Sequence, residues 1–289
     1  MIEVEGLRKT YNDVVAVAGS DFSVQSGEVY GLVGPNGAGK TTTLKMITGL
    51  LEPTTGNVRV ARGDPQNPST RKQLGWLPEE SPLYEDMTPM AYLKFFADIY
   101  DVPKSTANDR ISTILDRLNL PERKRRLGAC SKGMKRKVAI ARSLINDPSV
   151  LVFDEPASGL DPLTTHEVNQ FTQELADQDK TILLSAHNLH HIQSICDRVA
   201  IMHEGTIITQ GSLQEIQAEY GSTKYHIYTS IELPMSTEVN GEYRCTVESM
   251  DEVDRIRDKV LAKNGQITDI RTEESDLEDI FLSVTTGEA

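Results

Sequence analysis

The stretch Gly34-Pro35-Asn36-Gly37-Ala38-Gly39-Lys40-Thr41 is the most informative part of the chain. Residues 29–33 before it are apolar and predict a buried strand, and residues 42–47 after it predict the start of a helix. A strand, a glycine-rich loop and a helix in this order are what the pattern G-x-x-x-x-G-K-[ST] needs to form a phosphate-binding loop. The alternative, a tight turn with a chance lysine, does not explain why both flanks agree with the pattern.

The residue types of this loop suit a bound triphosphate. Gly34, Gly37 and Gly39 carry no Cβ, so consecutive backbone N–H groups can point at phosphate oxygens, and the helix N-terminus adds a partial positive charge. We expect Lys40 to bind the β- and γ-phosphates and the Thr41 hydroxyl to ligate Mg²⁺. The expected nucleotide-binding residues here are Gly34, Pro35, Asn36, Gly37, Ala38, Gly39, Lys40, Thr41 and Thr42.

Length and composition limit the possible functions. The 289 residues are enough for one large and one small domain, and 25% charged with 38% hydrophobic residues is a soluble globular composition. The net charge of −13 argues against a general nucleic-acid binder, which has a basic surface. Residues 222–289 hold 7 basic and 15 acidic residues and so carry −8 of this charge. We therefore expect no nucleic-acid partner.

The cysteines and the N-terminus bear on the compartment. Cys130, Cys196 and Cys245 are far apart and form no C-x-x-C pair, which suits a reducing compartment and supports neither disulfides nor a zinc site. The opening Met-Ile-Glu-Val-Glu contains no basic and apolar signal region. No apolar run approaches the roughly 20 residues that a membrane helix needs. Any membrane role is therefore expected to come through a partner.

Strands and helices alternate along most of the chain. Residues 1–33 predict strands, and residues 85–147 predict a helical insertion, because apolar residues recur there at helical spacing. We expect residues 1–221 to form an α/β domain of the P-loop NTPase class, with a mostly parallel central sheet and an N-terminal antiparallel β subdomain. Residues 222–289 predict a small C-terminal α+β accessory domain of the order ββαβα.

Acidic and histidine side chains follow two predicted central strands. Parallel strands present their C-terminal ends at one edge of the sheet, so Asp154 and Glu155 should lie beside the phosphate loop. Asp154 fits the carboxylate that Mg²⁺ requires, usually through water. Glu155 is the candidate to orient or deprotonate an attacking water. His187 follows the strand at residues 181–185 and should reach the γ-phosphate from the same edge.

Two further loops complete a family pattern. Ser131-Lys132-Gly133-Met134 stands 23 residues before Asp154, and Ser158-Gly159-Leu160-Asp161 follows Glu155. With the phosphate loop, the two acids, Tyr11 and Ser185-Ala186-His187, they occur in the order typical of one family. The chain resembles the ATP-binding subunit of an ABC transporter over roughly residues 1–220. Without these motifs, Tyr11 would be interpreted as a half-buried strand residue.

The resemblance implies a mechanism. Two such subunits sandwich two ATP molecules head to tail, each between the phosphate loop of one chain and Ser131 and Gly133 of the other. ATP binding closes the dimer and hydrolysis reopens it, which drives a separate membrane permease from the cytoplasmic face of the membrane. The implied roles are general base for Glu155, γ-phosphate sensor for His187, contact across the dimer for Asp161 and adenine platform for Tyr11.

The chain departs from the family pattern at three positions. Glu79 stands where the family usually has Gln, at the residue that contacts Mg²⁺ and the attacking water. A carboxylate also reaches Mg²⁺ but adds a charge, so we expect Glu79 to serve as a metal and catalytic residue. Lys132 and Met134 stand where Gly and Gln are common. Lys132 either approaches the phosphates in trans or faces solvent, and Met134 is expected to pack.

These departures, with residues 275–282, resemble the type-two exporter class of bacteria and archaea. We therefore expect the ATP-hydrolysing motor of an exporter, as a homodimer or a dimer with a paralogue. The alternative is a soluble ABC ATPase that acts on ribosomes or DNA, but such proteins usually carry two ATPase halves, a coiled coil or a zinc insertion. A nucleotide sensor without turnover would lack the catalytic acid, whereas Glu155 is present.

Overall fold

The computed structural model describes residues 1–187, 192–239 and 241–286. It divides into two compact units, Met1–Leu213 and Gln214–Ala289. This division comes earlier in the chain than the expected boundary after residue 221. The difference is helix α8 (Leu213–Tyr220), where Gln217 donates hydrogen bonds to the side chain of Glu274 and the carbonyl of Ser275 in the second unit.

The first unit is built on a six-stranded sheet with the order β5-β6-β7-β3-β8-β9. Of its five pairings, four are parallel and that of β8 with β9 is antiparallel, which confirms the mostly parallel central sheet. Strands β3, β6 and β7 are buried on both faces, which explains their continuous apolar sequences. The strands are β3 (Val29–Val33), β5 (Leu74–Leu77), β6 (Val150–Asp154), β7 (Thr181–Ala186), β8 (Arg198–His203) and β9 (Thr206–Ser212).

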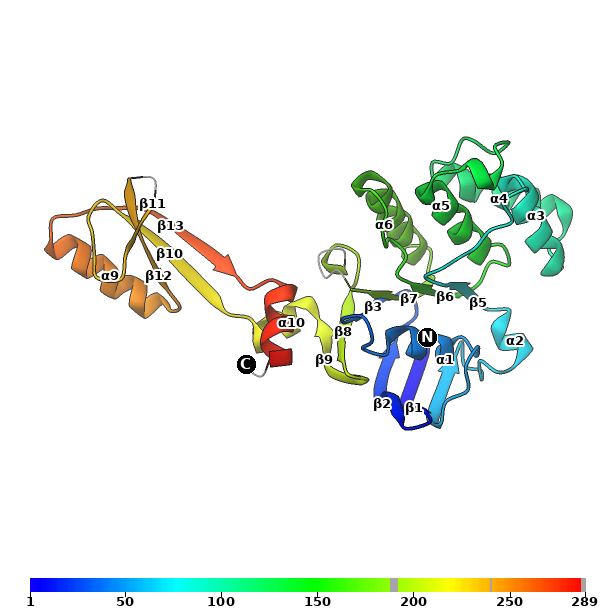
Figure 1. Cartoon of the computed structure of the whole chain (residues 1–289), viewed down its shortest axis with the longest axis horizontal. Helices are drawn as coiled ribbons and strands as arrows, with labels where there is room; N and C mark the ends of the chain where they lie inside the picture. The colour runs from blue at the N-terminus through cyan, green and yellow to red at the C-terminus, as the bar shows by residue number, and fades with distance from the viewer. Residues whose placement is uncertain (188–191, 240, 287–289) are drawn as a thin grey trace. The chain divides into compact units, whose positions relative to one another are not determined.

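An antiparallel sheet and a helix cover one face of the central sheet (Figure 1). This second sheet has the order β2-β1-β4, as expected for the N-terminal subdomain. Leu7, Leu32, Leu44 and Val152 are fully buried in the core between these layers, and Trp76 packs against it half-buried. The elements are β1 (Ile2–Tyr11), β2 (Val14–Val24), β4 (Thr55–Val60) and α1 (Lys40–Ile47).

Helices lie over the other face of the central sheet (Figure 1). They confirm the helical insertion, in which α3, α4 and α5 pack on one another. The side chains of Thr88, Ser131 and Asp161 cap α3, α5 and α6 by accepting backbone N–H hydrogen bonds. Among the described residues, no helix is long and apolar enough to cross a membrane. The bounds are α3 (Pro89–Ile99), α4 (Lys104–Arg117), η1 (Leu127–Ala129), α5 (Lys132–Ser143) and α6 (Pro162–Ala176). The short helix α2 (Pro68–Arg71) precedes β5 and is not one of them.

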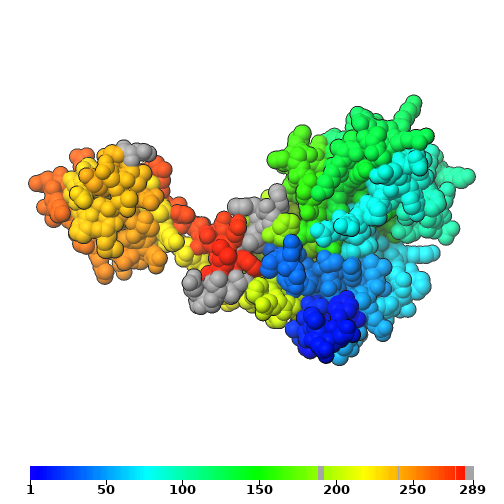
Figure 2. Space-filling model, in the orientation of Figure 1, coloured from blue at the N-terminus to red at the C-terminus, as the bar shows by residue number. Residues whose placement is uncertain are grey.

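The second unit has an antiparallel sheet with the order β11-β12-β10-β13 and a core of its own. Figure 2 shows β10 through α9, in yellow and orange, as one closely packed body. The expected order ββαβα was wrong by one strand, because β11 has three residues, too few to show a pattern. The core holds Ile227, Leu233, Cys245, Val253 and Val260. The elements are β10 (Thr223–Thr229), β11 (Thr237–Val239), β12 (Glu242–Val247), α9 (Met250–Ala262), β13 (Ile267–Glu274) and α10 (Leu277–Thr286).

Candidate active site

The phosphate loop connects β3 to α1 as expected, and its backbone conformation and close contacts require glycine at several positions. Gly37 and Gly39 have φ angles of +85° and +103°, which side-chain-bearing residues rarely adopt. A Cβ on Gly39 would lie 2.5 Å from the carbonyl oxygen of Ala16, and one on Gly34 would collide with the carbonyl oxygen of Met202. At positions 34 and 39 the loop therefore approaches its neighbours too closely for any residue but glycine.

Helix α1 begins without a side-chain cap. Its N-cap is Gly39, which has no side chain to accept a hydrogen bond, and its first turn contains no acidic residue. The first N–H groups of a helix have no intrahelical partner. The side chains of Thr88, Ser131 and Asp161 cap α3, α5 and α6, whereas α4 begins uncapped like α1. The start of α1 follows the glycine-rich loop that lines a groove, and this makes it the helix end suited to an anion.

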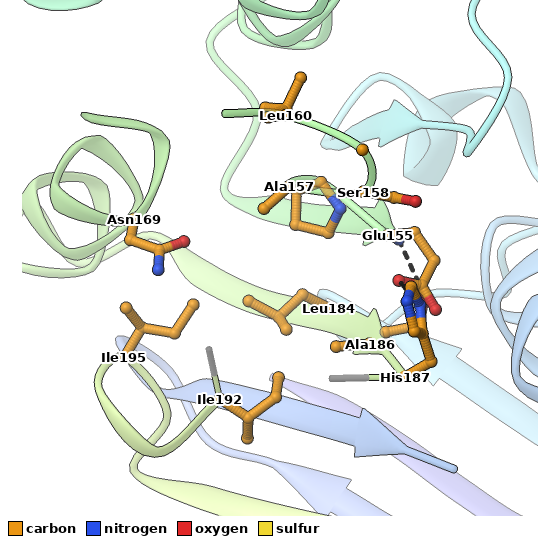
Figure 3. A pocket seen from close by; sticks show the side chains of 13 residues that line it. Glu155, Ala157, Ser158, Leu160, Asn169, Leu184, Ala186, His187, Ile192 and Ile195 are labelled. Atoms are coloured by element: carbon orange, nitrogen blue, oxygen red, sulfur yellow. Dashed lines mark hydrogen bonds and ion pairs between the residues drawn. The ribbon is translucent and has the colours of Figure 1, made fainter. Parts of the chain in front are cut away.

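The loop opens into a groove of about 400 Å³, lined also by Ala16, Glu79 and Glu155. This volume falls in the range of small-molecule pockets, about 300–1,000 Å³. A neighbouring cavity of about 140 Å³ lies beside Glu155 and His187 and has Leu184, Ile192 and Ile195 in its wall (Figure 3). The groove of about 400 Å³ is the candidate substrate site because it contains the phosphate loop.

Lys40 lies at the base of this groove with its side chain buried. Its ammonium donates hydrogen bonds to the carbonyl oxygens of Gly34 at 2.6 Å and Pro35 at 3.1 Å, and it lies 3.7 Å from Glu155 Oε1. Burial lowers the pKa of Lys40, while the carboxylates of Glu155 and Asp154 oppose this shift. The ammonium is thus held between the loop and Glu155, one of the two acids predicted to lie beside it.

Ser185 on β7 joins the two acids at the end of β6. Its hydroxyl donates to Asp154 Oδ1 at 2.6 Å and accepts from the backbone N–H of Glu155 at 3.0 Å. Glu155 has a φ angle of +50°, an uncommon conformation for a residue other than glycine. Such strain persists where surrounding contacts impose it, and it is frequent at functional sites.

Glu155 and His187 form a hydrogen-bonded pair (Figure 3). His187 Nδ1 lies 2.7 Å from Glu155 Oε2. The carboxylate is nearly buried, whereas about half of the imidazole side chain is exposed. One oxygen of Glu155 thus faces Lys40 and the other faces His187, which confirms that the ends of β6 and β7 bring these residues together.

The remaining expected residues lie at different places. Glu79 lines the groove, whereas Tyr11, Ser131, Gly133 and Asp161 are not among the described residues that line it. The Tyr11 ring is 46% exposed at the end of β1, and the Lys9 ammonium lies 5.3 Å from its centroid. The Lys132 ammonium lies close to Gly159 of the same chain.

The donor set at the groove fits Mg²⁺ only together with a nucleotide. Within the described residues there is no cluster of three or more Asp, Glu, His or Cys side chains that would form a protein-only metal site. Mg²⁺ commonly takes one or two protein oxygens besides water and substrate phosphates. The half-buried Thr41 hydroxyl and the carboxylates of Asp154 and Glu79 are oxygen donors of this kind.

Sequence reasoning missed two residues behind the groove. Ser185 was read only as part of a motif, and Arg136 was not singled out in α5. Both are buried, and both make hydrogen bonds to residues far away in the chain. A polar residue on the apolar face of α5 was the signal that could have pointed to Arg136.

A buried lysine at the uncapped start of α1, opposite a carboxylate at the end of a parallel strand, places the chain among the P-loop nucleoside triphosphatases. The family model described as ABC transporter matches residues 17–158. The chain belongs to this family as an ATP-binding protein of ABC transporters, and it is an ATPase.

Known proteins similar to the chain agree with this assignment. The ABC transporter ATP-binding protein NatA of Bacillus subtilis is 38% identical over 222 residues, which are 75% of this chain and 90% of NatA. The Nod factor export ATP-binding protein I of Burkholderia pseudomallei is 34% identical and aligns over 98% of this chain and 96% of its own length. A solved ATP-binding subunit of an ABC transporter has a TM-score of 0.70 and 32% identity, over 76% of this chain and 93% of that structure.

Proposed function

We propose that this ATPase is the motor of an exporter: it works as a head-to-tail dimer and moves a separate permease from the cytoplasmic face of the membrane. The observation that carries the proposal is the division of the site residues. Lys40, Glu155 and Glu79 line one groove, whereas Ser131 and Asp161 do not. The exporter class is supported by the relatives named as export proteins.

The division of the site favours a dimer. Ser131 is exposed at the start of α5, and its hydroxyl accepts the N–H of Met134 at 3.2 Å. Asp161 is exposed at the start of α6, and its carboxylate accepts from Thr164 N–H at 3.0 Å. Two ordered, capped helix starts on the surface can meet the nucleotide held by a second copy of the chain or by a paralogue. Tyr11 would serve as the platform on which adenine stacks.

The groove residues would carry out in-line hydrolysis. Glu155 accepts the proton of a water as the water oxygen bonds to the γ-phosphorus, the bond from that phosphorus to the β–γ bridging oxygen breaks, and ADP departs. His187 holds Glu155 through Nδ1 and can direct its other ring nitrogen at the γ-phosphate. Lys40 exchanges its backbone partners for phosphate oxygens. Mg²⁺ held by Thr41, Asp154 and Glu79 would supply neutralising charge to the phosphates.

An exposed apolar surface supports a protein partner. Four large side chains, two on α3 and one on each side of it, are between 41% and 56% exposed, and the rings of Tyr84 and Phe95 contact each other. Contiguous exposed apolar residues mark interaction sites more often than isolated ones do. We propose that the permease binds here, on the surface formed by Tyr84, Phe95, Ile99 and Tyr100.

The catalytic assignment is tested with Glu155→Gln. Removing the base while keeping the size should abolish turnover and trap an ATP-bound dimer, because ATP still binds. Size-exclusion chromatography with light scattering and phosphate release measure the two effects. Glu174→Gln, on the outer surface of α6 where Glu174 pairs with Arg117, is the matched control. Turnover of Glu155→Gln at the parent rate would show that Glu155 is not the base.

The partner is tested by purifying the tagged chain from detergent-solubilised membranes. A multi-spanning protein should accompany the parent and be lost from Phe95→Glu, while ATP binding by the purified chain stays unchanged. Recovery of ribosomes or nucleic acid instead would favour the soluble alternative and would leave the ATP site assignment intact.

A further inference from the structure

Every N–H group of the Arg136 guanidinium donates a hydrogen bond to a backbone carbonyl behind the active site. It lies on α5 with 8% of its surface exposed. Nε donates to Pro156 O at 2.9 Å; Nη1 donates to Pro78 O at 2.8 Å and to Glu79 O at 3.0 Å. Nη2 donates to Asp154 O at 2.8 Å and to Glu155 O at 2.7 Å. A guanidinium has five N–H groups, and all five have a carbonyl acceptor.

These carbonyls belong to two separate segments: the loop after β5, and the last residue of β6 with the loop that follows it. The side chains of Glu79 and Glu155 project from the same residues into the groove. Arg136 therefore holds both loops from behind, at a fixed distance from α5. At Glu155 it holds the carbonyl while Ser185 holds the N–H, so both sides of the strained residue are fixed.

Helix α5 has a second task at its N-terminus. Its N-cap is Ser131, which the proposed function assigns to the nucleotide on the partner copy. Ser131 and Arg136 lie within about one and a half turns of one rigid helix. A displacement at Ser131 is thus carried to the backbone of Glu79 and Glu155 in the chain's own groove.

We propose that Arg136 is a positioning residue that couples the two ATP sites: it sets Glu79 and Glu155 of its own groove according to where α5 lies against the partner's nucleotide. The inference rests on the proposed function, because it requires Ser131 to act in trans. Arg136 touches neither substrate nor metal in this role; it acts through the two loops.

The charge of Arg136 strengthens the arrangement. Burial lowers the pKa of its guanidinium to about 10, and the carboxylates of Asp154, Glu79 and Glu155 oppose that shift. The group therefore stays charged at neutral pH, and its hydrogen bonds are of the stronger, charge-assisted kind. Lysine keeps the charge, but its single ammonium on a flexible stem cannot reproduce the planar fork.

The test compares Arg136→Lys with Arg110→Lys in the full chain. Arg110 on α4 also donates to a backbone carbonyl, that of Ile145 at 2.6 Å, but away from the groove. We expect Arg136→Lys to lower kcat by about 10-fold to 100-fold, the scale of a misplaced catalytic group. The Kd for ATP, measured by calorimetry, should stay within about twofold, because no ATP ligand is removed. Arg110→Lys should change neither quantity.

Three results would overturn the inference: parental kcat in Arg136→Lys, equal losses of kcat and ATP affinity, or an equal loss of kcat in Arg110→Lys. If Arg136→Lys does not fold, amide exchange of the parent protein decides. Adding ATP should then change amide exchange at the start of α5 (residues 131–136) and also in the two loops (residues 78–80 and 154–158). A change in the two loops without a change at the start of α5 would contradict the coupling. Glu155→Gln separates the hypotheses, because the ATP-bound dimer that it should trap tests the proposed function while Arg136 is unchanged.

Discussion

At the scale of single residues, the site depends on a few buried hydrogen bonds and on glycine backbone. Asp154 and Glu155 are oriented by Ser185, and Glu155 is held in a conformation with positive φ. These contacts hold the acids ready before a nucleotide arrives, which lowers the reorganisation needed during hydrolysis.

Ser185→Ala tests this orientation. The substitution leaves the N–H of Glu155 without a partner and removes a donor from buried Asp154, so we expect a loss of about 1–3 kcal/mol in the free energy of unfolding and a lower kcat. Urea denaturation and phosphate release measure the two. Ser143→Ala is the control, because Ser143 is equally buried but donates only to Ile140 O of its own helix. Equal kcat losses in both variants would argue against the orienting role.

The glycines of the phosphate loop allow a matched pair of substitutions. Gly37→Ala and Gly39→Ala both force alanine into positive φ, but a Cβ at residue 37 has no atom within 4 Å, whereas one at residue 39 meets Ala16 O at 2.5 Å. We expect Gly39→Ala to lower stability by about 1–3 kcal/mol more and to abolish ATP binding. Calorimetric unfolding and ATP titration would show this difference, and equal destabilisation of the two would contradict it.

The sequence predicts those residues whose role follows from a local motif and its spacing. Lys40, Asp154 and Glu155 stand at fixed offsets from a strand end, and His187 follows the next such strand, so pattern and spacing were sufficient. Arg136 and Ser185 act through atoms that come together only in the folded chain, and nothing in their neighbours specifies those contacts. Tyr11, Ser131 and Asp161 stay predictions until a nucleotide complex tests them.

At the scale of elements, a short polar loop fastens α4, α5 and β7 together. Asp147, just after α5, accepts from Lys180 Nζ at 2.6 Å, immediately before β7, and lies 3.4 Å from Arg110 Nη2 on α4. The hydrogen bond from Lys180 is the main cause that lowers the pKa of the Asp147 carboxyl. The loop therefore links the helical insertion to the central sheet by charge as well as by packing.

Asp147→Asn tests this link through the pH dependence of the free energy of unfolding. A lowered pKa in the folded state means that the carboxylate stabilises the fold above its ordinary value of 3.8 and loses that effect as pH falls through the lowered pKa. Because the Asp147 side chain is 57% exposed, we expect a cost of about 0.2–1 kcal/mol at neutral pH, fading below about pH 4. Urea denaturation from pH 3 to pH 7 tests this; a cost that is constant with pH would contradict it.

Element prediction succeeded where the pattern was long and failed where it was short. The apolar residues of β6 and β7 and the helical spacing of α3 to α5 were clear. The sequence suggested two short runs in place of β2, which continues from Val14 to Val24 through bulges against β1. Three-residue β11 depends on pairing with β12 at the edge of its sheet, and such pairing leaves no local signature.

At the scale of the whole molecule, the chain consists of two units with separate cores. The second unit buries Ile227 and Val260 between its sheet and α9, and residues 222–289 carry most of the net charge. An independent core of this kind is expected to unfold in a transition of its own.

Val260→Ala and Leu261→Ala separate the two units. Val260 is fully buried, whereas Leu261 beside it is 61% exposed. We expect Val260→Ala to cost about 2 kcal/mol in one calorimetric transition and Leu261→Ala to cost little. Adding ATP and Mg²⁺ should raise only the midpoint temperature of the transition of the first unit, because a ligand stabilises the unit that binds it. A single transition shifted by both changes would show that the units unfold together.

The position of Trp76 gives the molecule a built-in optical signal. It is the one tryptophan of the chain and lies half-buried on β5, directly before the loop that carries Glu79 and is held by Arg136. Indole emission shifts in wavelength and intensity when its surroundings change polarity. Stopped-flow fluorescence of the unlabelled protein can therefore time the movement of this loop after ATP is mixed in, and can show whether it precedes or follows phosphate release.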